Sequence, residues 1–255
     1  MRGVKRVRGG LRHQLRAILV LAWLNGLLPI MRSPLWTIST LAMPISLLVL
    51  LTVLYRGIGL VMGIVGGLVW SMLSSGTALI GDAAYYRLEL KFQQMIVATP
   101  TNPLAYTVGL ALSEVVFTLP GIVLFAVLFT VVTPVDQWEA LRIALSLVLL
   151  WYSVSALAFY SSTLFTYIRY IWAVASLLTL VLGILPPVYY PAIYLGRMWW
   201  LAYLVPTSSS ALIIQDAVGV VHYSPLQVNL AYLSEVTWCL LGTVLVMRVA
   251  RWRSS

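Results

Sequence analysis

Six long apolar stretches fill most of this chain and constrain its fold more than any other feature. They cover residues 35–55, 58–80, 104–132, 141–165, 171–185 and 226–247, and the fifth can extend to Tyr190. The hydrocarbon core of a bilayer is about 30 Å thick, and a helix needs roughly 20 apolar residues to cross it. Charged residues make up only 9% of the chain. The sequence therefore predicts an all-α polytopic membrane protein with six transmembrane helices, in which residues 1–255 form a single transmembrane domain.

Most basic residues fall on one side of these stretches. With six crossings both termini share a compartment, and thirteen of the 16 lysines and arginines lie on that side. They are Arg2, Lys5, Arg6, Arg8, Arg12, Arg16, Arg32, Arg87, Lys91, Arg169, Arg248, Arg251 and Arg253. Cytoplasmic loops carry an excess of lysine and arginine. We therefore expect both termini, including the tail 248–255, in the cytoplasm, and the protein in the plasma membrane. Because this charge flanks apolar segments, it does not indicate nucleic acid binding.

The N-terminal segment, residues 1–34, is basic and partly apolar. Its apolar part, residues 17–31, would reach only about 22 Å as a helix, which is too short to span. Arg8, Arg12 and Arg16 form a stripe at four-residue spacing beside apolar positions. This pattern predicts an amphipathic interfacial helix at the inner surface. It can serve as a plain topology anchor or can also contact a cytoplasmic partner.

The longest predicted cytoplasmic loop between spans is 82–103. Apolar residues at helical spacing predict one short amphipathic helix over 85–98, and Asn102 followed by Pro103 predicts the N-terminus of the third span. Such a helix can lie on lipid or dock into a groove of a soluble partner.

The outer segment 191–225 is mostly apolar but is interrupted by prolines, as is the stretch just before it. Its pieces are too short to cross, and irregular backbone at membrane depth must be covered by protein or water. We expect a re-entrant helical hairpin before the last span; two helices lying on the outer surface are the alternative.

Two further patterns lie within the predicted spans. The first is a four-residue ladder of small residues that permits close helix packing: Gly59, Gly63, Gly67, Ser71 and Ser75. The second is a pair of carboxylates, Glu114 and Glu235, each roughly 15–18 Å from the inner boundary. Charged groups at that depth are costly, so they either line a substrate path or hydrogen-bond between helices.

Motifs for chemistry within the chain itself are absent from the sequence. A phosphate-binding loop needs glycines and a lysine before Ser or Thr, but Lys5 precedes Arg6 and Lys91 precedes Phe92. His13 and His222 are far apart and support no zinc site. We expect no catalytic residue, no metal site and no bound cofactor, and therefore no enzymatic activity in this chain.

The order of these parts resembles the membrane subunit of type-2 ABC exporters, the ABC-2 permease family. The resemblance is carried by Gly81-Asp82, Tyr86-Arg87-Leu88-Glu89 and Ala98-Thr99-Pro100-Thr101 around the inner loop, by Leu185 to Pro191 after span five, and by Trp199 to Thr207. In place of residues 91–94, Lys-Phe-Gln-Gln, the family often has Gly and Thr.

The resemblance implies that the inner-loop helix is a coupling helix that docks on a separate ATPase subunit. The implied docking residues are Tyr86, Arg87, Leu88, Glu89, Lys91, Phe92, Gln93 and Gln94. ATP and Mg would be bound by that partner. The resemblance also implies a dimer with a second permease copy or paralogue, and an outer hairpin that helps to close the exit.

Three other functions remain compatible with the sequence. One is a secondary transporter driven by protons through Glu114 and Glu235, which predicts inverted repeats that the hydropathy pattern does not clearly display. Another is a non-transporting membrane scaffold or assembly factor. The third, within the exporter class, is a permease for a haem-like cofactor.

Overall fold

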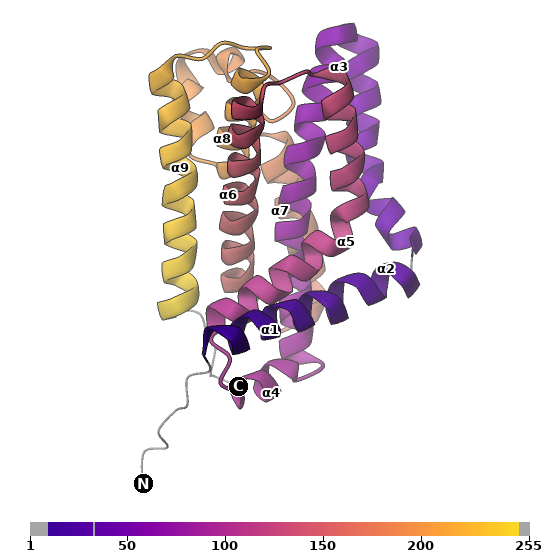
Figure 1. The fold of residues 1–255 in the computed structure, drawn as a ribbon, viewed down its shortest axis with the longest axis vertical. Helices are drawn as coiled ribbons and strands as arrows, with labels where there is room; N and C mark the ends of the chain where they lie inside the picture. The colour runs from indigo at the N-terminus through magenta and orange to yellow at the C-terminus, as the bar shows by residue number, and fades with distance from the viewer. Residues whose placement is uncertain (1–9, 33, 250–255) are drawn as a thin grey trace.

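The computed structural model describes residues 10–32 and 34–249, and these residues form helices without any strand. Long helices stand side by side as a bundle, and shorter segments cross its ends (Figure 1). In chain order the segments are α1 (Leu11–Ala22), a π-helical turn (Trp23–Leu27), α2 (Leu28–Arg32), α3 (Pro34–Leu88), α4 (Phe92–Val97), α5 (Pro103–Val132), α6 (Gln137–Ser162), a 3-10 turn (Ile168–Tyr170), α7 (Ile171–Ile184), a 3-10 segment (Ala192–Tyr203), α8 (Pro206–Ala217), α9 (Pro225–Val244) and a π-helical turn (Leu245–Val249).

Four helices in the described part are long and apolar enough to cross a membrane. They cover Ile38–Leu88, Pro103–Val132, Gln137–Ser162 and Pro225–Arg248, and a shorter apolar helix covers Ile168–Ile184. By the length and composition of its helices, the chain is therefore a multi-pass helical membrane protein, as predicted. Arg2, Lys5, Arg6, Arg8, Arg251 and Arg253, which entered the charge count, lie outside the described residues.

The longest helix, α3, contains both the first and the second predicted span. Its backbone leaves the helical region at Arg56, where φ is 53° and ψ is −131°, so two helices meet there. A Cβ on Gly59 would lie 2.0 Å from the Leu51 carbonyl oxygen, and one on Gly63 would lie 2.9 Å from the Leu48 Cα. The two halves of α3 therefore pack directly against each other after the chain turns back at Arg56 (Figure 1).

The remaining ladder residues face other parts of the bundle. A Cβ on Gly67 would meet the Phe125 ring of α5 at 2.1 Å, and a Cβ on Gly121 would lie 3.6 Å from Ser71 Oγ. Ser75 is fully buried and donates its hydroxyl to the Met72 carbonyl. The small residues thus let the second half of α3 approach its first half and α5 closely.

Helix α5 begins as the sequence predicts. Asn102 Oδ1 accepts the Ala105 N–H at 2.6 Å, and Pro103 occupies the first helical position. The start of α5 runs obliquely beside the N-terminal helical segment, which lies across the bundle (Figure 1). A Cβ on Gly26 would lie 2.7 Å from the Ser113 carbonyl oxygen. Because Ser113 precedes Glu114, Glu114 lies nearer this end of the bundle than a rise count along an upright helix predicts.

The predicted single helix over 85–98 is wrong. Helix α3 continues to Leu88, past the predicted end of the second span, and a separate helix α4 begins at Phe92. Lys91 has a φ of 52°, in the left-handed region, so the helix cannot continue through it. The reason is the Ala83–Ala84 pair, which is buried in the core and carries the apolar face of α3 beyond the expected boundary.

The segment before the last helix differs from a simple pair of helices. Residues 192–203 form a 3-10 segment with non-helical backbone at Gly196 and Met198. Helix α8 is buried on all sides from Thr207 to Gln215 and packs against α6, α9 and α3. Its Thr207 hydroxyl donates to the Leu182 carbonyl of α7 at 2.7 Å. Helix α8 is therefore an internal element of the bundle and does not lie on its surface.

Candidate functional site

Two ends of the bundle carry the candidate sites. Helices α1 and α4 lie at one end, which we call the α4 end, and the turn of α3 at Arg56 lies at the opposite end, which we call the Arg56 end (Figure 1). The predicted docking residues Tyr86 to Gln94 fall on the last turn of α3, on the break at 89–91 and on α4. The structure therefore brings them together at the α4 end.

The docking segment has an inward and an outward side. Phe92 packs against the ring of Tyr86, with centroids 6.0 Å apart, and Leu88 and Ile96 also contact the core. Met95, Leu90 and Tyr85 are 60%, 50% and 40% exposed, and Glu89 and Lys91 are also exposed. The side chains of Gln93 and Gln94 lie outside the described part. An apolar surface rimmed by charge is thus presented next to α4.

Arg87 points away from this surface, into the bundle. Its guanidinium donates to the carbonyl oxygens of Ser162 and Phe165, both at 2.6 Å, and of Thr163 at 3.2 Å. These carbonyls lie at and just beyond the end of α6, where backbone acceptors lack helical partners and the helix dipole is negative. Arg87 therefore fastens the end of α3 to the end of α6. The docking role expected for Arg87 came from the family resemblance alone.

Gln14 makes a second polar link at the α4 end. Its amide nitrogen donates to the Pro100 carbonyl at 2.9 Å, and its amide oxygen accepts the Asn102 N–H at 3.0 Å. This one side chain ties α1 to the loop that joins α4 to α5. A movement of α4 would therefore be passed to α1 as well as to α3.

A groove of about 610 Å³ opens beside the end of α3. Leu88 and Glu89 form one wall, and the loop before α7 forms the other, with Thr166, Tyr167, Ile168, Arg169 and Tyr170. Tyr167 and Tyr170 are 73% and 63% exposed. The accessible surface at the α4 end therefore extends beyond the residues that the sequence singled out.

Of the two carboxylates predicted within the spans, Glu114 is buried beside a third carboxyl group. The side chain of Asp82 on α3 lies beside that of Glu114 on α5, with the Tyr86 and Tyr106 rings nearby. Two neighbouring carboxyl groups inside the bundle repel each other when both are charged, so a shared proton stabilises the pair. Asp82 could not be recognised as a partner from the sequence, because the pairing of α3 with α5 is a tertiary contact.

The second carboxylate, Glu235, lies in a separate hydroxyl-lined position. Ser146 of α6 donates to Glu235 Oε1 at 2.7 Å, and Ser146 Oγ lies 2.8 Å from Ser210 Oγ of α8. Glu235 is fully buried, and its Oε2 atom has no hydrogen-bond partner among the described residues. Glu114 and Glu235 therefore have different partners, on different helices, and their role in a substrate path stays a prediction.

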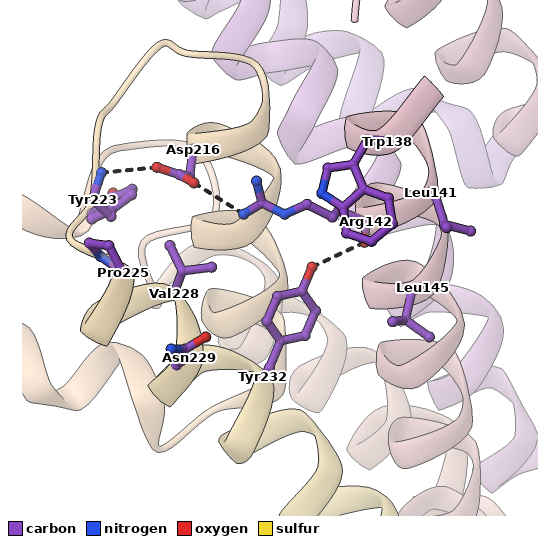
Figure 2. A pocket seen from close by; sticks show the side chains of 10 residues that line it. All are labelled: Trp138, Leu141, Arg142, Leu145, Asp216, Tyr223, Pro225, Val228, Asn229 and Tyr232. Atoms are coloured by element: carbon purple, nitrogen blue, oxygen red, sulfur yellow. Dashed lines mark hydrogen bonds and ion pairs between the residues drawn. The ribbon is translucent and has the colours of Figure 1, made fainter. Parts of the chain in front are cut away.

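A groove of about 550 Å³, which we call the distal groove, opens at the Arg56 end between α6, α8 and α9. Figure 2 shows its ten lining residues, Trp138, Leu141, Arg142, Leu145, Asp216, Tyr223, Pro225, Val228, Asn229 and Tyr232. Arg142 donates to Glu139 Oε2 at 2.7 Å and to Asp216 Oδ2 at 3.1 Å. Arg142 is one of the three basic residues outside the cytoplasmic set, and its sequence position alone does not reveal its partners. Asp216, a carboxylate within the apolar outer segment, is the sequence signal for this site.

Metal chemistry finds no support in residues 10–32 and 34–249, where no three His, Cys, Asp or Glu side chains gather closely enough to hold an ion. No protein-family model, no curated protein and no solved structure matches the chain.

Proposed function

We propose that this chain is the membrane permease subunit of an ATP-driven exporter of the ABC-2 type, coupled to a separate ATPase at its α4 end. The observation that carries the proposal is the surface beside α4. Between two long apolar helices, a short helix and its flanking break leave Leu90 and Met95 exposed at the α4 end, near the exposed Glu89 and Lys91. Exposed apolar groups rimmed by charge are typical of sites that bind another protein.

The contacts around this surface suit the transmission of force. Phe92 and Ile96 pack on the core, Arg87 holds α3 to α6, and Gln14 holds the following loop to α1. A push on α4 would therefore reach three helices through packed side chains and hydrogen bonds. ATP and Mg would be held by the partner, because the sequence has no phosphate-binding loop.

The finer topology belongs to the same proposal. The two halves of α3, with α5, α6, α9 and the helical stretch Ile168–Ile184 that contains α7, give six crossings. The segment from α1 to α2 lies at the inner surface of the plasma membrane, and both termini are cytoplasmic. Helix α8 with the 3-10 segment re-enters from the outside, which its burial among α3, α6 and α9 supports. A second permease, identical or related, would complete the transporter.

Variants at the exposed positions test the docking step. Met95→Glu and Leu90→Glu place a charge on the proposed contact without removing a core side chain, whereas Phe92→Glu would also disturb the packing with Tyr86. We expect a co-purifying ATPase with a phosphate-binding loop, lost from both variants. Tyr194→Glu, at a residue 75% exposed in the 3-10 segment, is the matched control and should retain it. Equal recovery of the ATPase with all variants would contradict the proposal.

A proton-coupled secondary transporter is the second candidate, and the Asp82–Glu114 pair favours it. Two carboxyl groups that share one proton at a helix contact can gain or lose that proton as the helices move. This function predicts transport driven by an imposed pH gradient without ATP, abolished by Glu114→Gln and by Asp82→Asn. Transport that needs ATP and survives both substitutions would exclude it.

A further inference from the structure

We propose that the distal groove binds an amphipathic organic cation, a molecule with an ammonium group on an apolar body. Its volume of about 550 Å³ falls within the range of about 300–1,000 Å³ typical of small-molecule sites. The proposal concerns the Arg56 end alone and is independent of how the α4 end obtains energy.

The groove has charged and apolar parts side by side. Arg142 and Asp216 supply the charge, and Leu141, Leu145 and Val228 supply apolar walls beside Asn229 and Tyr232 (Figure 2). A ligand with a charged group on an apolar body matches this mixed lining. The apolar end would replace water against leucine and valine side chains, which is the favourable part of binding.

The charge around the polar end selects a cation. Glu139 of α6 and Asp216 of α8 both pair with the guanidinium of Arg142, so two carboxylates face one positive charge. The net charge of this group is negative even with the Arg142 ion pairs intact. The side chains of Arg142, Glu139 and Asp216 are 22%, 26% and 17% exposed, so their field is screened less than that of freely hydrated groups.

Aromatic rings reinforce the preference. Trp138 and Tyr232 line the groove, and Trp138 is 67% exposed, so its face is available to an ammonium group. The Tyr223 ring is fixed in the wall, because its hydroxyl donates to Gln215 Oε1 and accepts the Ala192 N–H. The groove therefore offers rigid aromatic walls beside negative charge, an arrangement that favours an organic cation over a neutral or anionic ligand.

Binding of octyltrimethylammonium to the full chain in nanodiscs tests the proposal, with octanol and octyl sulfate as probes of equal chain length. We expect saturable binding of the cation alone. Glu139→Gln and Trp138→Leu should each raise its Kd about two- to fivefold, from the value of an exposed ion pair or cation–π contact. Arg142→Gln, which removes the positive charge, should leave the Kd unchanged or lower it.

Two controls separate this role from a structural one. Glu89→Gln removes an equal charge at the α4 end and should leave the Kd unchanged, and thermal unfolding establishes that each variant is folded. Nanodiscs with and without choline headgroups identify the source of the ammonium group: competition by choline lipid indicates a lipid ligand, and its absence indicates a free amphiphile. No saturable binding, equal binding of octyl sulfate, or equal effects of Glu139→Gln and Glu89→Gln would overturn the proposal.

Discussion

The two ends of the bundle are fastened by different kinds of contact. At the α4 end, Arg87 and Gln14 bond to backbone groups of α6 and of the loop before α5. At the Arg56 end, Arg142 bonds to Glu139 and Asp216, side chain to side chain, and the bond from the Tyr232 hydroxyl to the Arg142 carbonyl is long, at 3.5 Å. A backbone carbonyl is fixed by its helix, whereas two side chains can both rotate and change partners. We therefore expect the helices at the α4 end to move together, and the helices at the Arg56 end to separate more easily.

Removing the Arg87 side chain should have the largest effect. Arg87→Ala leaves three carbonyl oxygens at the end of α6 without their cationic donor, and hydrogen bonds to charged groups contribute about 1.5–3 kcal/mol each in the general case. Because the site is partly exposed and water can replace some contacts, we expect a loss of about 3 kcal/mol in unfolding free energy, measured by thermal unfolding in detergent. If this variant were as stable as the wild type, Arg87 would not fasten α3 to α6, and the proposed difference between the two ends would be contradicted.

A methyl group at Gly59 should have the next largest effect. Gly59→Ala would press a Cβ against the Leu51 carbonyl oxygen at 2.0 Å, which the backbone can relieve only by separating the two halves of α3. Overpacking of this kind costs about 1–3 kcal/mol. The matched control is Gly57→Ala, since a Cβ there meets nothing within 4 Å. Equal unfolding temperatures for the two variants would contradict the close packing of the α3 halves.

Loss of the Gln14 amide should have a smaller and local effect. Gln14→Ala removes the donor to Pro100 and the acceptor of the Asn102 N–H, at an exposed site, so we expect about 1 kcal/mol. Hydrogen exchange should accelerate at the Asn102 amide and in α1, with no change in α8. Gln137→Ala, at an exposed glutamine at the start of α6, is the control. Unchanged exchange at Asn102 would show that α1 is not tied to this loop.

The smallest effect is expected at the Arg56 end. Asp216→Asn weakens one of the two ion pairs of Arg142, and partly exposed ion pairs contribute about 0.2–1 kcal/mol. A double-mutant cycle with Arg142→Gln measures the coupling free energy between α6 and α8 directly. A coupling free energy well above about 1 kcal/mol would mean that the helices at the Arg56 end are held as firmly as those at the α4 end. That result would contradict the proposed difference between the two ends.

The sequence predicted the parts of this fold that depend on local pattern. The positions of the long apolar stretches predicted α5, α6, α7 and α9 to within a few residues. The Asn102–Pro103 pair predicted the start of α5. The end of α3 was missed because burial of Ala83 and Ala84 depends on neighbouring helices and leaves no periodic signature. The early start of α6 was missed because Asp136, its cap, lies among polar residues outside the apolar stretch.

The candidate site was less predictable than the fold. Sequence spacing found Glu114 and Glu235 individually, but their partners Asp82, Ser146 and Ser210 lie on other helices. Arg87 was assigned to an exposed surface, although its long side chain reaches the end of α6. Contacts between distant segments fix these roles, and hydropathy contains no information about which helices are neighbours.

Cross-linking from position 95 in native membranes tests the central claim most directly. The variant Met95→Cys in a Cys239→Ala background carries a single thiol, exposed on α4, because Cys239 is the sole cysteine of the sequence. We predict a cross-link to a protein with a phosphate-binding loop, with a yield that changes when ATP is added. A thiol that reacts only with lipid or with a second copy of the chain, at a yield indifferent to ATP, would contradict the account.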